Sequence, residues 1–251
     1  EHVPSALQTE KLNVQGNTEE YLSYEPLGVI GNISAWNYPY LVGVNVLIPA
    51  LLAGNGVLYK PSEFATLTGQ KIVELFCQAG LDDSVLGLII GEAEAGKNML
   101  ELDLDGYFFT GSYKTGKYIA EQVASKLVPL GLELGGKDPL YITDDLYSVE
   151  QAAASAVEGA FYNNGQSCCA VERIYVHEKV YAEFVSSFIK KVEELPLVPL
   201  TRSEQLAVLE KQMADASAKG AKVQTGGNRL RRPGNYFTPA VLTDVTEQML
   251  I

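Results

Sequence analysis

The chain has 251 residues, of which 47% are hydrophobic and 20% are charged, and no apolar run is long enough to span a bilayer. The formal net charge of −12, from 19 basic and 31 acidic residues, argues against nucleic acid as a partner, because phosphate contacts need clustered cations. Only two histidines are present and no Cys-x-x-Cys spacing occurs, so we predict neither a metal site nor a disulfide framework. Because the N-terminus shows no signal-peptide pattern, we expect a cytoplasmic protein without membrane contact.

Apolar runs of strand length alternate with segments of helical period, which predicts an α/β fold with a mainly parallel sheet. Residues 12–25 carry Gln15-Gly16-Asn17 between apolar and aromatic residues, a pattern that predicts a hairpin with a glycine turn. Strands are predicted at 28–33, 57–60, 88–90, 106–109 and 127–130, with helices at 66–79 and 113–125. A strand at 139–142, a helix at 148–160 and a strand at 174–177 predict a second domain, which gives boundaries of 1–134 and 135–251.

Two features of this pattern have plain structural interpretations. Cys77 lies on the apolar stripe of the helix 66–79 and is expected in the core. The one basic cluster, residues 229–232, precedes Pro233-Gly234 and is expected to be a solvated loop.

The turns after the predicted strands are rich in glycine and polar residues. They hold the residues 60–63, Gly91 with Gly96, and Gly111-Ser112. Open parallel sheets bind ligands outside the carboxyl ends of their strands, so this placement predicts a dinucleotide site. The ordinary Gly-x-Gly-x-x-Gly fingerprint is absent, which on general grounds weighs against NAD.

The run Asn164-Gly165-Gln166-Ser167-Cys168-Cys169 places two adjacent cysteines after a polar turn that contains glycine. A thiolate is a good nucleophile toward electrophilic carbon, and such a setting suits a reactive thiol. The alternative is that these cysteines are small apolar core residues.

Two further segments carry candidate catalytic groups. Glu133 follows a predicted buried strand and precedes two glycines, and burial there would raise its pKa toward the range of a general base. Asn37 follows the strand 28–33, beside the only tryptophan, and its amide could donate to a developing oxyanion. Each residue could instead be an ordinary polar residue of a strand end or a turn.

Taken in chain order, the three segments around Asn37, Glu133 and Cys168 resemble the motifs of the aldehyde dehydrogenase superfamily. The resemblance spans nearly the whole chain. Further matching segments are residues 24–30, 49–55, 60–63, 108–112 and Thr115-Gly116. The resemblance implies a variant Rossmann cofactor domain and a second α/β catalytic domain. It also implies that Cys168 is the nucleophile, that Glu133 is the base, and that Asn37 donates to the oxyanion together with the backbone N–H of Cys168.

The resemblance to this family outweighs the absence of the Gly-x-Gly-x-x-Gly fingerprint as an argument against NAD. It implies NAD as the cofactor, with the pyrophosphate near Gly111-Ser112 and the adenosine ribose held by Lys60 and Glu63. The other implied cofactor-binding residues are Trp36, Ser62, Gly91 and Leu134. A carboxylate at position 63 would repel a 2′-phosphate, so NAD is favoured over NADP. The hairpin at 12–25 matches part of an oligomerisation arm, which implies a homodimer or homotetramer.

The implied reaction is the oxidation of an aldehyde to a carboxylic acid through a cysteine thiohemiacetal and thioester. In the family, about a hundred residues precede the position of Glu1, and a Glu-x-Phe-Gly-Pro segment follows the position of Ile251. We therefore expect a chain that lacks N- and C-terminal parts of the family. The alternative function is a catalytically deficient nucleotide-binding or structural derivative of the same fold.

Overall fold

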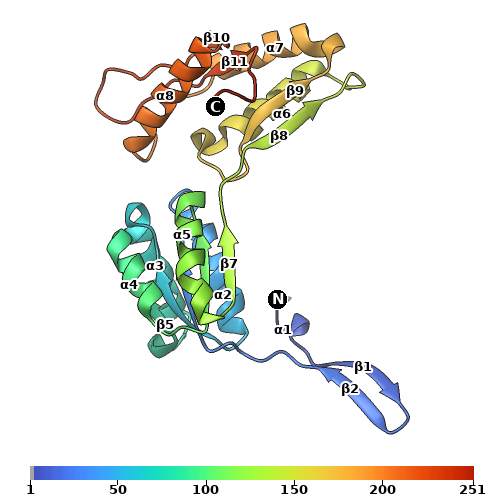
Figure 1. Cartoon of the computed structure of the whole chain (residues 1–251), viewed down its shortest axis with the longest axis vertical. Coiled ribbons are helices and arrows are strands. Elements are labelled where there is room, and N and C mark those ends of the chain that lie inside the picture. Colours follow the sequence, from blue (N-terminus) through green and yellow to red (C-terminus); the bar gives the residue numbers. More distant parts are fainter. Residues whose placement is uncertain (1–2) are drawn as a thin grey trace. The chain divides into compact units, whose positions relative to one another are not determined.

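The computed structural model describes residues 3–251, and contacts between residues divide the chain into two compact units (Figure 1). The first unit extends to Gly135 and the second is Gly136–Ile251. Among the described residues, no helix combines the length and the apolar character needed to cross a membrane. The predicted roles of the two parts, cofactor binding and catalysis, stay predictions.

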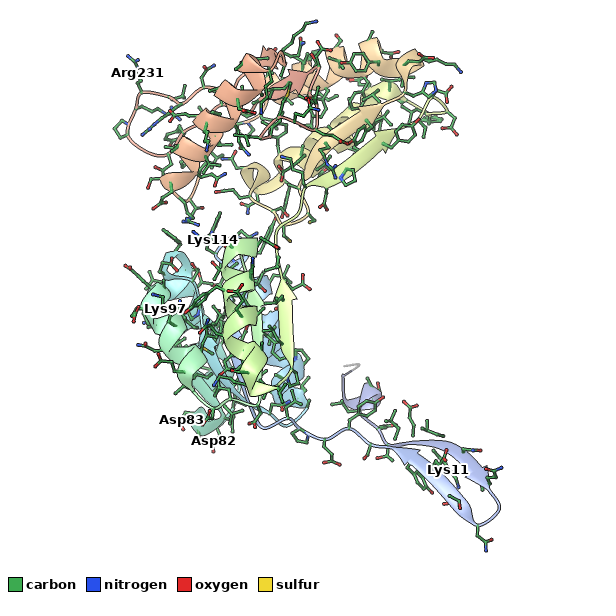
Figure 2. All side chains as sticks on the ribbon, viewed as in Figure 1. Lys11, Asp82, Asp83, Lys97, Lys114 and Arg231 are labelled. Atoms are coloured by element: carbon green, nitrogen blue, oxygen red, sulfur yellow. The ribbon has the colours of Figure 1, made fainter. Side chains whose placement is uncertain are left out.

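The first unit begins with a short helix and a two-stranded antiparallel hairpin. These are α1 (Val3–Ala6), β1 (Glu10–Gln15) and β2 (Thr18–Leu22). Gly16 adopts the positive φ of 63° that the tight turn requires, so the predicted hairpin is confirmed. All residues of both strands are exposed, and Lys11 forms a 2.7 Å ion pair with Glu19 across the hairpin (Figure 2).

A five-stranded, fully parallel sheet follows, in the order β5-β4-β3-β6-β7. Its strands are β3 (Val29–Ile33), β4 (Gly56–Lys60), β5 (Leu86–Leu88), β6 (Gly106–Thr110) and β7 (Leu130–Glu133). Its helices are α2 (Pro39–Leu52), α3 (Thr66–Gln78), α4 (Ala93–Glu101) and α5 (Tyr113–Val123). Short 3₁₀ turns are η1 (Glu63–Ala65), η2 (Asp83–Val85) and η3 (Ala124–Lys126). The predicted α/β class with a parallel sheet is confirmed.

Alternation along the strands builds one core on each face of the sheet. On one face, Ile30, Val57 and Tyr59 pack with Leu47 of α2 and Ile72 of α3. On the other face, a second cluster joins strand residues to α4 and α5: Met99, Leu100, Leu104, Tyr107, Phe109, Ile119 and Val123. Helices therefore cover both faces, as expected of a parallel sheet.

Two strands are displaced from their predicted positions. The segment predicted as a strand at 127–130 begins with Leu127, which is 92% exposed and has a left-handed φ of 54°. This residue turns the chain out of η3, so β7 starts only at Leu130. The strand predicted at 88–90 occupies Leu86–Leu88, because it starts directly after η2, which Asp82 caps by accepting a hydrogen bond from the Ser84 backbone N–H.

The expectation that Cys77 lies in the core is wrong. Cys77 is exposed, and α3 buries Gly69 and Ile72 instead. An apolar stripe read along the sequence does not show how far the sheet extends beneath a helix, so a residue at the end of α3 can lie beyond it.

The second unit pairs β8 (Asp138–Ile142) with β9 (Val171–Val176) in parallel and β10 (Lys222–Thr225) with β11 (Val241–Thr243) in antiparallel. Its helices are α6 (Val149–Phe161), α7 (Glu178–Glu193) and α8 (Glu204–Ala218), and the 3₁₀ turn η4 is Tyr162–Gly165. The predicted strand at 139–142 and helix at 148–160 are confirmed, and the last predicted strand starts earlier, at Val171. The core is formed mainly by small residues of α6 against Phe184 and Phe188 of α7.

Candidate active site

The carboxyl ends of the five parallel strands carry nearly all the candidate residues of the first unit. Ile33 pairs with Lys60 and Thr110 pairs with Glu133, so these strands end at one level. Hydrogen bonds join the loops that follow, because Ser34 N donates to Lys60 O at 3.0 Å and Gly111 N donates to Glu133 O at 2.9 Å. The fold thus brings residues distant in sequence to one edge.

The strand order places a topological switch point between β3 and β6. The chain runs from β3 outward through β4 to β5 and then returns to β6 on the other side of β3. The loops after β3 and β6 therefore leave the sheet in opposite directions, which opens the crevice where sheets of this kind bind ligands. Trp36 and Asn37 lie in the first of these loops, and Gly111 and Ser112 lie in the second.

Ser112 is the N-cap of α5 and explains the start of that helix. Its side chain accepts a hydrogen bond from Thr115 N at 3.3 Å. The N-terminus of α5 therefore lies at the carboxyl edge, where its N–H groups and partial positive charge suit a phosphate. A Cβ added at Gly116 would lie 2.5 Å from a methyl carbon of Leu134, so Gly116 lets Leu134 pack against the first turns of α5.

Lys60 ends β4, and the loop that follows holds Ser62 and Glu63. Lys60 is only 4% exposed, and its ammonium donates to Pro61 O at 3.3 Å. Burial lowers the pKa of Lys60 from its ordinary value of 10.5, and the nearby Glu63 carboxylate opposes this shift. Ser62 donates to Glu63 Oε2 at 3.1 Å and caps η1 by accepting from Phe64 N. An ammonium that donates hydrogen bonds, beside a carboxylate that accepts them, fits ribose hydroxyls.

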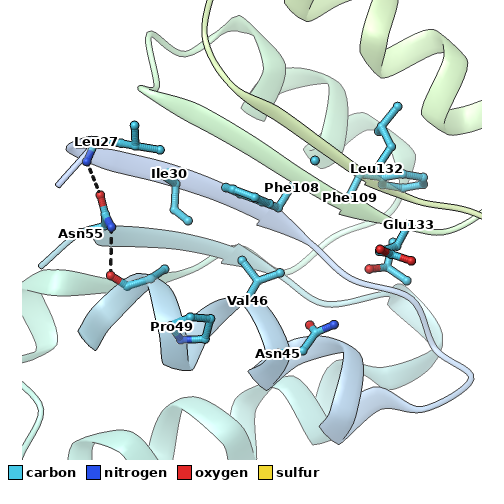
Figure 3. A pocket seen from close by; sticks show the side chains of 13 residues that line it. Leu27, Ile30, Asn45, Val46, Pro49, Asn55, Phe108, Phe109, Leu132 and Glu133 are labelled. Atoms are coloured by element: carbon cyan, nitrogen blue, oxygen red, sulfur yellow. Dashed lines mark hydrogen bonds between the residues drawn. The ribbon is translucent and has the colours of Figure 1, made fainter. Parts of the chain in front are cut away.

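Glu133 ends β7, and the expected burial of its side chain is wrong because the residue is exposed. It borders a pocket of about 420 Å³ between α2 and the strands β3, β6 and β7 (Figure 3). Most of the lining is apolar and includes Ile30, Val46, Pro49 and Phe108. Sequence reasoning missed this pocket, because its walls come from elements that become neighbours only in the folded sheet.

The adjacent cysteines lie in the second unit, in a loop held by backbone and side-chain contacts. Asn163, Asn164 and Gly165 have left-handed φ values of 51°, 61° and 72°, a conformation that asparagine and glycine tolerate. Asn164 Nδ2 donates to Val198 O at 2.8 Å, and Gln166 Oε1 accepts from Thr201 N at 3.0 Å.

Both cysteines that follow this loop are exposed, so the alternative that they fill the core is wrong. The Ser167 hydroxyl lies 3.3 Å from Cys169 Sγ. An exposed thiol on an anchored loop fits the nucleophile that the resemblance implies.

The basic cluster at 229–232 is a solvated loop, as predicted. Arg229 and Arg231 are exposed, and the Arg231 side chain extends away from the ribbon (Figure 2). Arg229 lies 4.0 Å from Glu210 of α8, and the guanidinium of Arg232 lies 3.6 Å from the centre of the Tyr236 ring. Within residues 3–251, no group of three or more His, Cys, Asp or Glu side chains is arranged to hold a metal ion.

Comparisons with known proteins agree with this geometry. Residues 2–251 match the family model described as the aldehyde dehydrogenase family. A 4,4′-diapolycopene aldehyde oxidase of Methylomonas sp is 38% identical over 90% of this chain and 43% of its own length. The peroxisomal aminoaldehyde dehydrogenase 2 of Pisum sativum is 36% identical over 90% of this chain and 48% of its own length.

A solved structure shows the same fold. The NAD+ complex of an aldehyde dehydrogenase from Bacillus cereus superposes with a TM-score of 0.92 at 32% identity, over 99% of this chain and 53% of that one. The chain spans about half the length of the relatives that it matches. Because the family model matches nearly all residues of this chain, the chain belongs to the aldehyde dehydrogenase family.

Proposed function

We propose that this chain is part of an NAD-dependent enzyme that oxidises an aldehyde to a carboxylic acid. One observation carries the proposal: the ends of β4 and β7 and the loops after β3 and β6 bring Lys60, Glu133, Asn37 and Ser112 to one edge of the parallel sheet. The match to the family supports it, because the segments that resemble the family's motifs fall within the matched residues 2–251.

Cofactor binding would use the loops that follow the strands. The N-terminus of α5, capped by Ser112, would hold the pyrophosphate, and Lys60 with Glu63 would hold the adenosine ribose. Trp36, Ser62, Gly91, Gly111 and Leu134 complete the proposed set. When bound, NAD would accept the hydride that leaves the substrate carbon. The Glu63 carboxylate would disfavour the 2′-phosphate of NADP.

The chemistry of the chain begins with Cys168. Its thiolate would attack the aldehyde carbon and form a carbon–sulfur bond, while the carbonyl electrons move to oxygen. The Asn37 amide and the backbone N–H of Cys168 would stabilise this oxyanion. Loss of hydride from the thiohemiacetal leaves a thioester. Glu133 would then take a proton from water, whose oxygen attacks the thioester carbon, and the carbon–sulfur bond breaks to release the carboxylic acid and the Cys168 thiolate.

The hairpin β1–β2 supports the proposal of a homodimer or homotetramer. A two-stranded hairpin with no buried face is marginally stable in water, so its exposed Leu12 and Val14 side chains suit contact with another copy of the chain. This part of the proposal rests on the resemblance and on that exposure.

The experiment is to follow NADH formation by its ultraviolet absorbance with a panel of aliphatic, aromatic and amino aldehydes. We expect turnover that is lost in Cys168→Ser. Binding of NAD without turnover for any aldehyde would contradict the enzymatic proposal. That result would favour the alternative of a nucleotide-binding or structural derivative.

A further inference from the structure

A buried polar cluster lies behind the turn that carries Trp36 and Asn37. Tyr59 of β4 is 1% exposed, on the face of the sheet beneath α2, and its phenol oxygen accepts a hydrogen bond from Ser34 Oγ at 3.2 Å. Ser34 is itself 4% exposed. Neither polar group can be compensated by solvent, so the hydrogen bond between them matters to the local structure.

Ser34 is the first residue of the turn, and it is attached to β4 twice. Its backbone N–H donates to Lys60 O at 3.0 Å, and its hydroxyl donates to the neighbouring Tyr59. The last two residues of β4 therefore fix both the backbone and the side chain of the residue at which the chain leaves β3.

A glycine in helix α2 leaves room for the phenol of Tyr59. A Cβ added at Gly43 of α2 would lie 2.7 Å from the Tyr59 hydroxyl oxygen, so only glycine leaves room for the phenol there. Asn32 of β3 pairs directly with Tyr59 in the sheet, and its Nδ2 donates to Gly43 O at 3.2 Å. Hydrogen bonds and close packing thus link Asn32 of β3, Tyr59 of β4 and Gly43 of α2 beside the hydroxyl group that bonds to Ser34.

We propose that Tyr59 is a positioning residue whose phenol, through Ser34, holds the turn of Trp36 and Asn37 in the geometry that the reaction needs. This inference rests on the proposed function, because it takes Asn37 as the oxyanion donor. Such a donor acts only when it is preorganised, and a displacement of about 1 Å can lower a rate by about a hundredfold.

The test is Tyr59→Phe, which removes one oxygen atom and retains the ring. Tyr107→Phe is the matched control, because Tyr107 is also 1% exposed, lies on the opposite face of the same sheet, and donates its phenol hydrogen to Leu102 O at 2.6 Å. Both variants lose one buried tyrosine hydrogen bond, so a general loss of stability affects both of them.

The first measurement does not depend on activity. Trp36 is the only tryptophan of the chain, so its fluorescence reports on this turn alone. We expect a shifted emission maximum and a larger acrylamide quenching constant in Tyr59→Phe and in Ser34→Ala, with the wild-type spectrum in Tyr107→Phe. An unchanged Trp36 signal in Tyr59→Phe, or an equal change in Tyr107→Phe, would overturn the inference.

The second measurement is a double-mutant cycle on the enzyme. We expect Tyr59→Phe to lower kcat about tenfold and to have no further effect on kcat in an Asn37→Ala background. An equal loss in both backgrounds would show that Tyr59 does not act through Asn37. If Asn37→Ala itself retains kcat, the proposed role of Asn37 fails, and the Trp36 measurement still decides whether Tyr59 holds the turn.

Discussion

At the scale of single residues, the adjacent cysteines are the first test of the proposed mechanism. Both thiols are exposed, and the Ser167 hydroxyl lies 3.3 Å from Cys169 Sγ. The proposed mechanism uses Cys168 alone, and Cys169 is therefore a matched control in the same loop.

We expect Cys168→Ser to lower kcat by about a thousandfold or more, because a serine hydroxyl without a positioned base is a far weaker nucleophile than a thiolate. Cys169→Ser is expected to retain kcat within a few-fold. Steady-state NADH formation measures both variants. The opposite pattern, with activity lost only in Cys169→Ser, would assign the nucleophile to the second cysteine.

We expect the burial of the charged Lys60 ammonium to lower the free energy of unfolding, and its proposed role in binding the ribose explains why a lysine stands there. Because burial lowers its pKa below 10.5, the folded state holds the proton of Lys60 less tightly than the unfolded state does. The resulting loss in the free energy of unfolding is fully present below the lowered pKa. It decreases as the pH rises from the lowered pKa toward the unfolded value, where both states become neutral.

Lys60→Met is therefore expected to raise the free energy of unfolding at neutral pH while it weakens NAD binding. The stability difference from wild type should narrow as the pH approaches 10.5. Urea unfolding across this pH range and titration with NAD measure the two effects. A Lys60→Met variant that is less stable than wild type at neutral pH would contradict this assignment.

At the scale of elements, contact between α2 and β4 depends on a glycine that the helix itself does not need. A Cβ at Gly43 would meet the Tyr59 hydroxyl at 2.7 Å and the Ile72 Cδ1 atom at 3.0 Å. Gly96, in the interior of α4, offers a comparison, because its added Cβ would meet only carbons of Lys60 at 3.8 Å.

We expect Gly43→Ala to destabilise the protein by about 1–3 kcal/mol through overpacking. Gly96→Ala should stabilise it by up to about 1 kcal/mol, because alanine favours a helix interior. Thermal or urea unfolding distinguishes the two variants.

A suppressor gives a sharper test of the contact. Tyr59→Phe removes the oxygen atom that the new methyl group would meet, and so it should recover part of the stability lost in Gly43→Ala. Simple addition of the two losses in the double variant would show that the hydroxyl is not the source of the strain.

At the scale of the whole molecule, the exposed hairpin is the element through which we propose contact with another copy of the chain. Replacing Leu12 and Val14 with aspartate adds charge where an apolar contact is proposed. We expect this variant to dissociate toward monomers in analytical ultracentrifugation, with little change in the unfolding of the five-stranded sheet. Lys11→Ala, which breaks only the exposed ion pair with Glu19, should leave the assembly unchanged. If the double aspartate variant keeps the oligomeric mass of the wild type, the hairpin is not part of the interface.

The sequence by itself determined the α/β class, the hairpin, the helices α3, α5 and α6, and the strand ends and loops that carry the candidate residues. These features follow from local periodicity, from glycine turns and from capping residues such as Ser112, all of which act within a few residues along the chain. The tertiary structure decided what depends on neighbours distant in sequence. In the folded chain Cys77 and Glu133 are exposed and Lys60 is buried. β7 begins only at Leu130, after Leu127 with its left-handed φ. The tertiary structure also brought Tyr59 beneath Ser34, because the burial and the partners of a side chain are set by the elements that pack against it, and those are chosen only when the sheet forms.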